Sequence, residues 1–121
     1  MTGTLNKKQL GDLSEQRACD FLITKGLQIL TRNYRTRFGE IDLIMQEKNG
    51  EVVFVEVRNR SLSDFENAIE SVSWNKQQKI IKTAMHYLEE QDLTNKVNCR
   101  FDIIGFSENH FDWIKDAFFY D

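Results

Sequence analysis

The segment GEIDLIMQEKNGEVVFVEVRNR, residues 39–60, has the pattern of a β-hairpin. Two runs rich in isoleucine, leucine, valine and phenylalanine flank the turn-forming dipeptide Asn49-Gly50. Glu40, Asp42 and Glu56 nevertheless lie inside the predicted strands, where removing a carboxylate from water is costly. These acids therefore need either solvent or a compensating positive charge.

The alternation of side chains predicts how the two strands pair. A three-residue loop, 48–50, with Gly50 in the left-handed conformation, places Leu43 opposite Val55. A two-residue loop would shift the pairing by one residue and mix apolar with polar side chains on each face. The three-residue loop instead joins two apolar rows, which are Ile41, Leu43 and Met45 on the first strand and Val53, Val55 and Val57 on the second.

On the other face, the same register places Asp42 opposite Glu56 and Glu40 opposite Arg58. Opposed side chains have Cβ atoms about 5 Å apart, so two like charges there are destabilising unless something neutralises them. Two carboxylates, completed by water and a phosphate, suit Mg²⁺ or Mn²⁺. Acids are also common on the solvent-facing side of an antiparallel sheet, and the hairpin alone leaves that alternative open.

Periodic patterns outside the hairpin predict the other elements. The apolar spacing indicates helices over 8–25 and 74–90, and strands over 27–33, 97–106 and 113–119, with a loop-rich segment at 61–73. This order predicts a single mixed α/β domain over residues 1–121. On the first helix, the predicted buried side holds Leu10, Ala18, Phe21 and Leu22, with Glu15 at its edge. Trp74 is predicted to be a core anchor.

Composition excludes some classes of protein and favours others. No run approaches the roughly 18 apolar residues of a membrane span, so no membrane partner is expected. Cys19 and Cys99 are unclustered, which favours a reducing compartment, the cytoplasm, and argues against a zinc site. The net charge of −3 argues weakly against a nucleic-acid partner, but the basic residues gather in the first three quarters of the chain.

Several motifs together resemble those of one protein family. They are Gly11-x-x-Ser14-Glu15-x-x-Ala18, Asn33-x-Arg35, GEIDLI at 39–44 and VFVEVRNR at 53–60. This ordered set, within a similarity over residues 8–120, resembles the YraN-like family of small bacterial proteins, which are regarded as predicted endonucleases. The resemblance implies a restriction-endonuclease-like fold, with an αβββαβ core and a central mixed sheet flanked by helices. It also implies kinship with Holliday junction resolvases, some of which work as homodimers.

The resemblance also implies an active site. Glu15, Asp42 and Glu56 take the acid positions, where they would hold Mg²⁺ or Mn²⁺, and Arg58 takes the position of the usual lysine. Arginine cannot serve as a general base, although it can neutralise charge that builds on phosphoryl oxygens. The resemblance thus admits a metal-dependent endonuclease acting on DNA, including branched DNA. It also admits a catalytically degenerate nucleic-acid-binding module of DNA repair or recombination.

Four basic residues are predicted to contact nucleic acid. Arg35 and Arg60 match the family motifs, whereas Lys76 and Lys79 lie on a ridge of the second helix. A solvated helix face would give the same ridge, so that alternative stays open. A third class of function, a protein-interaction domain that uses the aromatic tail at 110–121, also remains open.

Overall fold

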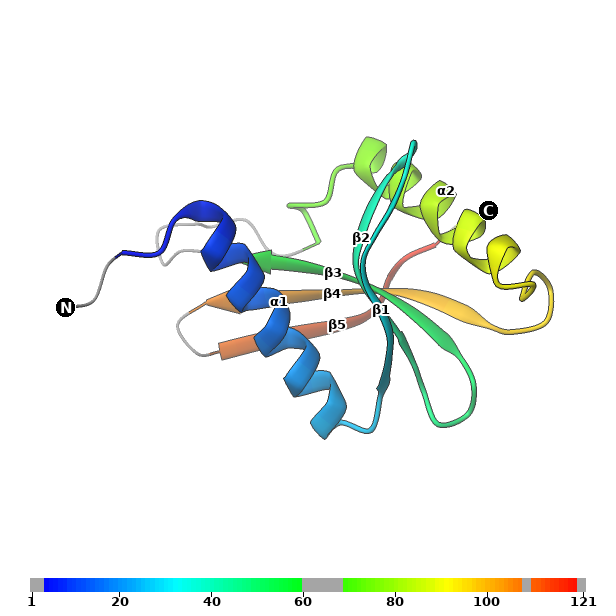
Figure 1. The fold of residues 1–121 in the computed structure, drawn as a ribbon, viewed down its shortest axis with the longest axis horizontal. Coiled ribbons are helices and arrows are strands. Elements are labelled where there is room, and N and C mark those ends of the chain that lie inside the picture. Colours follow the sequence, from blue (N-terminus) through cyan, green and yellow to red (C-terminus); the bar gives the residue numbers. More distant parts are fainter. Residues whose placement is uncertain (1–3, 60–68, 108–109, 120–121) are drawn as a thin grey trace.

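The computed structural model describes residues 4–59, 69–107 and 110–119, and these residues form two helices and a five-stranded sheet (Figure 1). Neither of these helices combines the length and the apolar character that crossing a membrane requires. The predicted order of helices and strands is confirmed, including the last strand. The elements are α1 (Lys7–Thr24), β1 (Gln28–Thr36), β2 (Gly39–Gln46), β3 (Val52–Asn59), α2 (Trp74–Glu90), β4 (Cys99–Ser107) and β5 (His110–Phe118).

The sheet is mixed, as predicted, and its strands follow one another in sequence order. β1, β2 and β3 form an antiparallel meander, β4 runs parallel to β3, and β5 returns antiparallel to β4. A parallel neighbour needs a crossover connection, and α2 lies within the one between β3 and β4. Figure 1 shows α1 in front of the sheet at lower left and α2 at upper right.

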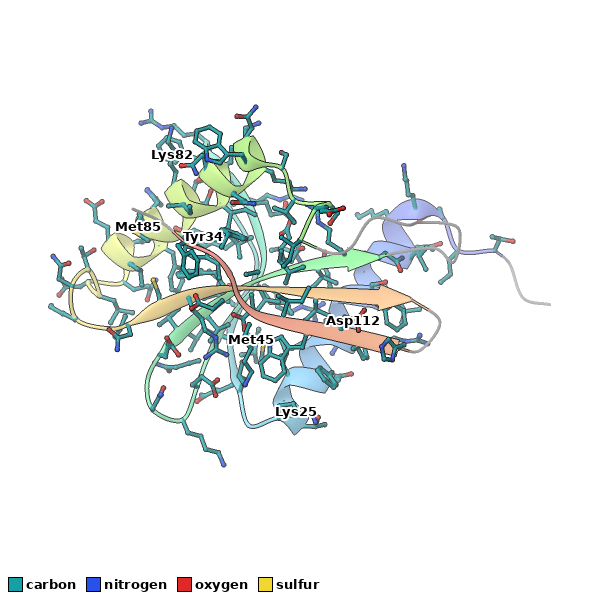
Figure 2. The ribbon with its side chains drawn as sticks, turned by 180° about the vertical axis from the view of Figure 1, so that it is seen from behind. Lys25, Tyr34, Met45, Lys82, Met85 and Asp112 are labelled. Atoms are coloured by element: carbon teal, nitrogen blue, oxygen red, sulfur yellow. The ribbon has the colours of Figure 1, made fainter. Side chains whose placement is uncertain are left out.

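The two helices cover different faces of the sheet, and each face has its own apolar core. The face under α2 buries Ile44 and Phe54, with Tyr34 and Met85 packed against its edge (Figure 2). The face under α1 buries a second set, which comprises Leu43, Met45, Val53, Val55 and Ile104 of the sheet and Ala18, Cys19 and Leu22 of the helix. Successive strand residues alternate between these cores, which explains why β2 and β3 are apolar almost throughout.

The predicted hairpin register is confirmed over the paired part of the strands. Leu43 lies opposite Val55 and Met45 opposite Val53. The loop has three residues, 48–50, because the Glu47 N–H donates to the Glu51 carbonyl at 2.9 Å. Gly50 has a φ of +95°, a conformation that side-chain-bearing residues rarely adopt, so glycine closes this turn without strain.

The strand β2 changes face near its start, where the prediction for Ile41 is wrong. Ile41 belongs to the core under α2, whereas Leu43 packs toward α1. The β2–β3 pairing begins only at Leu43, so residues 39–41 follow β1 alone and lie against α2. A Cβ added to Gly39 would lie 3.5 Å from the Thr83 hydroxyl, which shows how closely the helix approaches. The alternation therefore breaks at Asp42.

Two further predictions about burial are wrong. Leu10 is 42% exposed, because the buried residues of α1 begin only at Ser14. Trp74 is 69% exposed and anchors no core, because the first buried residue of α2 is Ile80. Cys19, on the same helix as Leu10, is buried. Both errors arise where a helix begins, before it reaches the sheet.

Candidate active site

Asp42 lies where β2 and β3 part. One of its carboxylate oxygens, Oδ2, accepts a hydrogen bond of 2.8 Å from the Val57 N–H on β3. In a continuous ladder that N–H would bond a carbonyl on the neighbouring strand, so the carboxylate takes the place of a main-chain acceptor. Asp42 is thus half-buried and fixed toward β3.

Glu56 is a buried acid on β3, with only 6% of its surface exposed. Burial, then the charge of Asp42 and a hydrogen bond between the two carboxyl groups, together raise the pKa of Glu56 to about 8. The two acids that the hairpin register placed opposite each other therefore do meet. Since a protonated carboxyl can donate to a carboxylate, Glu56 holds a proton at neutral pH when no cation is bound.

Two cations also reach Glu56. The Arg58 Nη2 lies 3.2 Å from Glu56 Oε2, and the Lys76 Nζ lies 3.4 Å from the same oxygen. Among the residues that the structure describes, the Nε and Nη2 groups of Arg58 are buried without a hydrogen bond of good geometry. Buried donors without partners are costly, so this guanidinium is suited to an anionic ligand.

Glu15 brings a third carboxyl group to the same region from α1. Burial, the charge of Asp42 and then the charge of Glu40 together raise the pKa of Glu15 to about 7. Glu15 is half-buried on α1. The structure therefore places Glu15 within electrostatic reach of Asp42 and Glu40, and it places Glu56 against Asp42.

Asn33 connects two of these acids. With its amide nitrogen turned toward them, Asn33 donates to Glu15 Oε1 at 2.9 Å and to Glu40 Oε1 at 3.3 Å. Asn33 adopts a φ of +51°, a conformation that asparagine tolerates better than most residues. In the sequence, only the Asn33-x-Arg35 motif pointed to Asn33, and the motif by itself predicted no role for this side chain.

The remaining predicted residues have different surroundings. Arg35 is exposed and forms an ion pair with Glu40, so the predicted pairing of Glu40 with Arg58 is wrong. The reason is that the β2–β3 ladder ends before it reaches either residue. Lys79 is exposed on α2, whereas Arg60 lies outside the described residues.

A divalent cation fits the chemistry of this site, but three ligands are not preassembled. Among the described residues, no group of three His, Cys, Asp or Glu side chains is arranged to hold a metal ion. Asp42 and Glu56 form a pair of oxygen donors whose mutual repulsion a cation would relieve. Mg²⁺ commonly uses only one or two carboxylates, together with water and phosphate oxygens. The pair therefore fits such an ion.

The fold and the site together define an α/β protein whose mixed sheet carries an acidic cluster at the point where two strands part. The chain belongs to the family described as uncharacterised protein family UPF0102, which it matches over residues 14–106. This match confirms the YraN-like family that the motifs predicted.

Relatives in this family extend over most of the chain. A UPF0102 protein of Coxiella burnetii (strain RSA 331 / Henzerling II) is 43% identical over 111 residues, which cover 91% of this chain and 92% of that protein. A UPF0102 protein of Methylobacillus flagellatus is 47% identical over 114 residues, which cover 92% and 97%.

Two solved structures have a backbone similar to that of this chain. A repair endonuclease from Pyrococcus abyssi is 17% identical with a TM-score of 0.43, over 87% of this chain and 39% of that one. The structure of an EndoMS–dsDNA complex is 16% identical with a TM-score of 0.41, over 85% of this chain and 36% of that one. The chain thus spans less than half of either protein.

Substituting Glu56 by glutamine tests the electrostatics of the site in the metal-free protein. Glu56 ionises near pH 4.5 in an unfolded chain but near pH 8 in the folded protein, so the folded state binds more protons between these values. The free energy of unfolding should therefore fall as the pH rises from 5 to 8, by about 1.4 kcal/mol per unit of pKa difference at most. Urea unfolding in chelator should show Glu56→Gln gaining stability over the wild type as the pH rises.

A matched control for this experiment is Glu89→Gln, which alters an exposed acid on α2. This control should leave the dependence of stability on pH as it is in the wild type. A Glu56→Gln variant whose difference from the wild type is the same at pH 5 and pH 8 would contradict the raised pKa.

Proposed function

We propose that this protein is a metal-dependent endonuclease that hydrolyses DNA phosphodiester bonds, with branched DNA among its substrates. The observation that supports this function best is the pair of carboxyl groups, Asp42 and Glu56, which meet at the parting of two strands beside two cations. Such a pair is poorly suited to a merely structural role, because keeping two carboxyl groups together away from water costs stability, whether the second stays charged or takes up a proton. It is well suited to holding Mg²⁺ or Mn²⁺.

In this proposal the chain's own residues divide the work. Asp42 and Glu56 hold the ion, and Glu15 completes or orients the site from α1. When bound, the ion supplies Lewis-acid activation of the phosphoryl group and of the attacking water. Arg58 stabilises the negative charge that develops on the phosphoryl oxygens, and its buried Nε and Nη2 groups, which lack a hydrogen bond of good geometry, support that assignment. Because Arg58 keeps its proton, it takes no part as a base.

The DNA contacts of the proposal lie around this centre. Arg35, Lys79 and Arg60 would neutralise backbone phosphates, and each such contact adds roughly one unit to the salt dependence of binding. Arg35 and Lys79 are exposed, as such contacts require. A homodimer would suit a branched substrate with two equivalent strands.

A second candidate function is a nucleic-acid-binding module of DNA repair or recombination that does not cleave. Two observations favour it, namely an arginine at the position of the usual lysine and the lack of three preassembled metal ligands among the described residues. Such a module would keep salt-dependent DNA binding but would gain nothing from a divalent cation.

Cleavage and metal binding separate the two functions. The wild-type protein is expected to cut linear, nicked or four-way DNA in Mn²⁺, and excess chelator should abolish the cutting, because the ion activates the phosphoryl group. Calorimetric titration with Mn²⁺ alone should show saturable heat. Salt-dependent DNA binding with no scission of any of the three substrates, and no heat with Mn²⁺, would favour the binding module instead.

A further inference from the structure

Lys76 occupies a different position from the one that its sequence pattern suggests. The helical period placed it with Lys79 on an outer ridge, as a peripheral phosphate contact. In the structure its Nζ lies 3.4 Å from Glu56 Oε2, within the cluster that contains Asp42 and Arg58. Its charge is therefore directed at the candidate reaction centre, whereas Lys79 is exposed.

The start of α2 explains this direction. Ser73 caps the helix, and its hydroxyl accepts a hydrogen bond of 3.2 Å from the Lys76 N–H. Lys76 thus lies in the first turn, one turn before the buried Ile80, on the side of the helix that faces the sheet. A long side chain there extends past the end of the α2 core and reaches β3.

Lys76 also lies where a ligand would enter. The Glu56 side chain is 7% exposed and the Arg58 side chain 21% exposed, whereas the Lys76 side chain is 44% exposed. The three side chains therefore form a gradient from the interior to solvent. A phosphate that approached the carboxyl pair from solvent would meet the Lys76 ammonium group before the Arg58 guanidinium.

We infer that Lys76 contacts the scissile phosphate itself and belongs to the reaction centre of this protein, together with Arg58. This inference rests on the proposed nuclease function and refines it. Negative charge builds on the phosphoryl oxygens in the transition state, and a fixed positive charge beside them lowers the barrier. Arg58 supplies one such charge from β3, and Lys76 supplies the second from α2.

The alternative is that Lys76 merely holds the Glu56 side chain in the position from which it would bind the ion. The two roles predict different effects on metal binding. A purely structural Lys76 would support Glu56, so its loss would weaken both Mn²⁺ binding and cleavage. A Lys76 that acts on phosphate competes with the cation for Glu56 in the absence of DNA, so its loss would leave Mn²⁺ affinity unchanged or higher while cleavage falls.

The experiment compares Lys76→Ala and Lys76→Arg with Lys82→Ala, which removes the same charge from an exposed position on the same helix (Figure 2). At saturating DNA in Mn²⁺, Lys76→Ala should lower the single-turnover cleavage rate at least about 100-fold, the effect of losing one transition-state contact. Lys76→Arg should restore most of that loss because it keeps the charge. Lys82→Ala should cleave within about twofold of the wild type, since its charge contributes only to the diffuse field.

Two binding measurements complete the test. The dissociation constant for DNA in chelator should rise no more for Lys76→Ala than for Lys82→Ala, and Mn²⁺ titration of Lys76→Ala should show undiminished affinity. A Lys76→Ala variant that cleaves as fast as Lys82→Ala would overturn the inference and leave the proposed function intact. Weakened Mn²⁺ binding would likewise overturn it in favour of the structural role. A wild-type protein that cuts no DNA would overturn the proposed function itself.

Discussion

Replacing Asp42 by asparagine is expected to reduce Mn²⁺-dependent DNA cleavage by at least about 1,000-fold, because the ion loses a charged ligand at the reaction centre. Asparagine keeps the shape of the side chain, and its carbonyl oxygen can still accept the Val57 N–H that Asp42 accepts at 2.8 Å. The fold should therefore survive. The change removes the negative charge that repels Glu56, so the effect on cleavage reports the loss of a charge in the site.

The measurement is single-turnover cleavage with excess protein, together with DNA binding in chelator. Binding should be equal to or tighter than that of the wild type, because a negative charge near the phosphate has gone. Asp92→Asn is the matched control, since it alters an exposed aspartate that pairs with Lys96 on the surface. Cleavage that persists in Asp42→Asn and resists chelator would show that the carboxyl pair is not the active site.

Replacing Arg100 by methionine is expected to lower the free energy of unfolding by about 3–5 kcal/mol, the cost of leaving a buried charge without its partner. Arg100 Nε donates to Asp102 Oδ1 at 3.0 Å, and its other nitrogens lie 2.9 Å from carboxylate oxygens of Glu47 and Glu51. Asp102 is fully buried, so it keeps its desolvation cost when the guanidinium is removed. The network also joins the hairpin loop to β4.

Urea unfolding at neutral pH measures this effect, and Lys96→Met is the matched control. Lys96 pairs with Asp92 at 3.1 Å, but both side chains are mostly exposed, so its loss should cost less than about 1 kcal/mol. Removing Asp102 as well, in Arg100→Met with Asp102→Leu, should recover part of the stability, although the Trp113 Nε1–H then loses its acceptor. An Arg100→Met variant as stable as Lys96→Met would contradict the prediction.

The hairpin shows which features of this fold follow from local sequence. β2 and β3 are adjacent along the chain, and alternating apolar residues together with Gly50 leave one register that buries both rows. The same logic predicts from the sequence that Asp42 and Glu56 are partners. The prediction for Ile41 was wrong because periodicity assumes that β2 pairs with β3 along its whole length, whereas Ile41 pairs with β1 alone.

The site shows what local sequence leaves open. Helical periodicity gives the angle between two side chains on one helix, but it does not give the rotation of that helix against a sheet. Periodicity therefore predicted that Lys76 lies on an exposed ridge, although the packing of α2 directs its side chain to Glu56. The prediction that Trp74 anchors the core was wrong for a related reason, since a helix begins before its apolar face reaches the core. Asn33 had no visible role until β1 lay beside β2 and α1.

The amino-acid sequence by itself determined the order of helices and strands, the pairing of the central hairpin and the family to which the chain belongs. Those features depend on neighbours in sequence, whose geometry the backbone restricts to a few choices. Only the tertiary structure decided that Glu15 lies close to Asp42, that Lys76 joins Arg58 at Glu56, and that Arg100 is enclosed by acids. These contacts join separate elements, so they depend on how helices and strands pack together after each has formed.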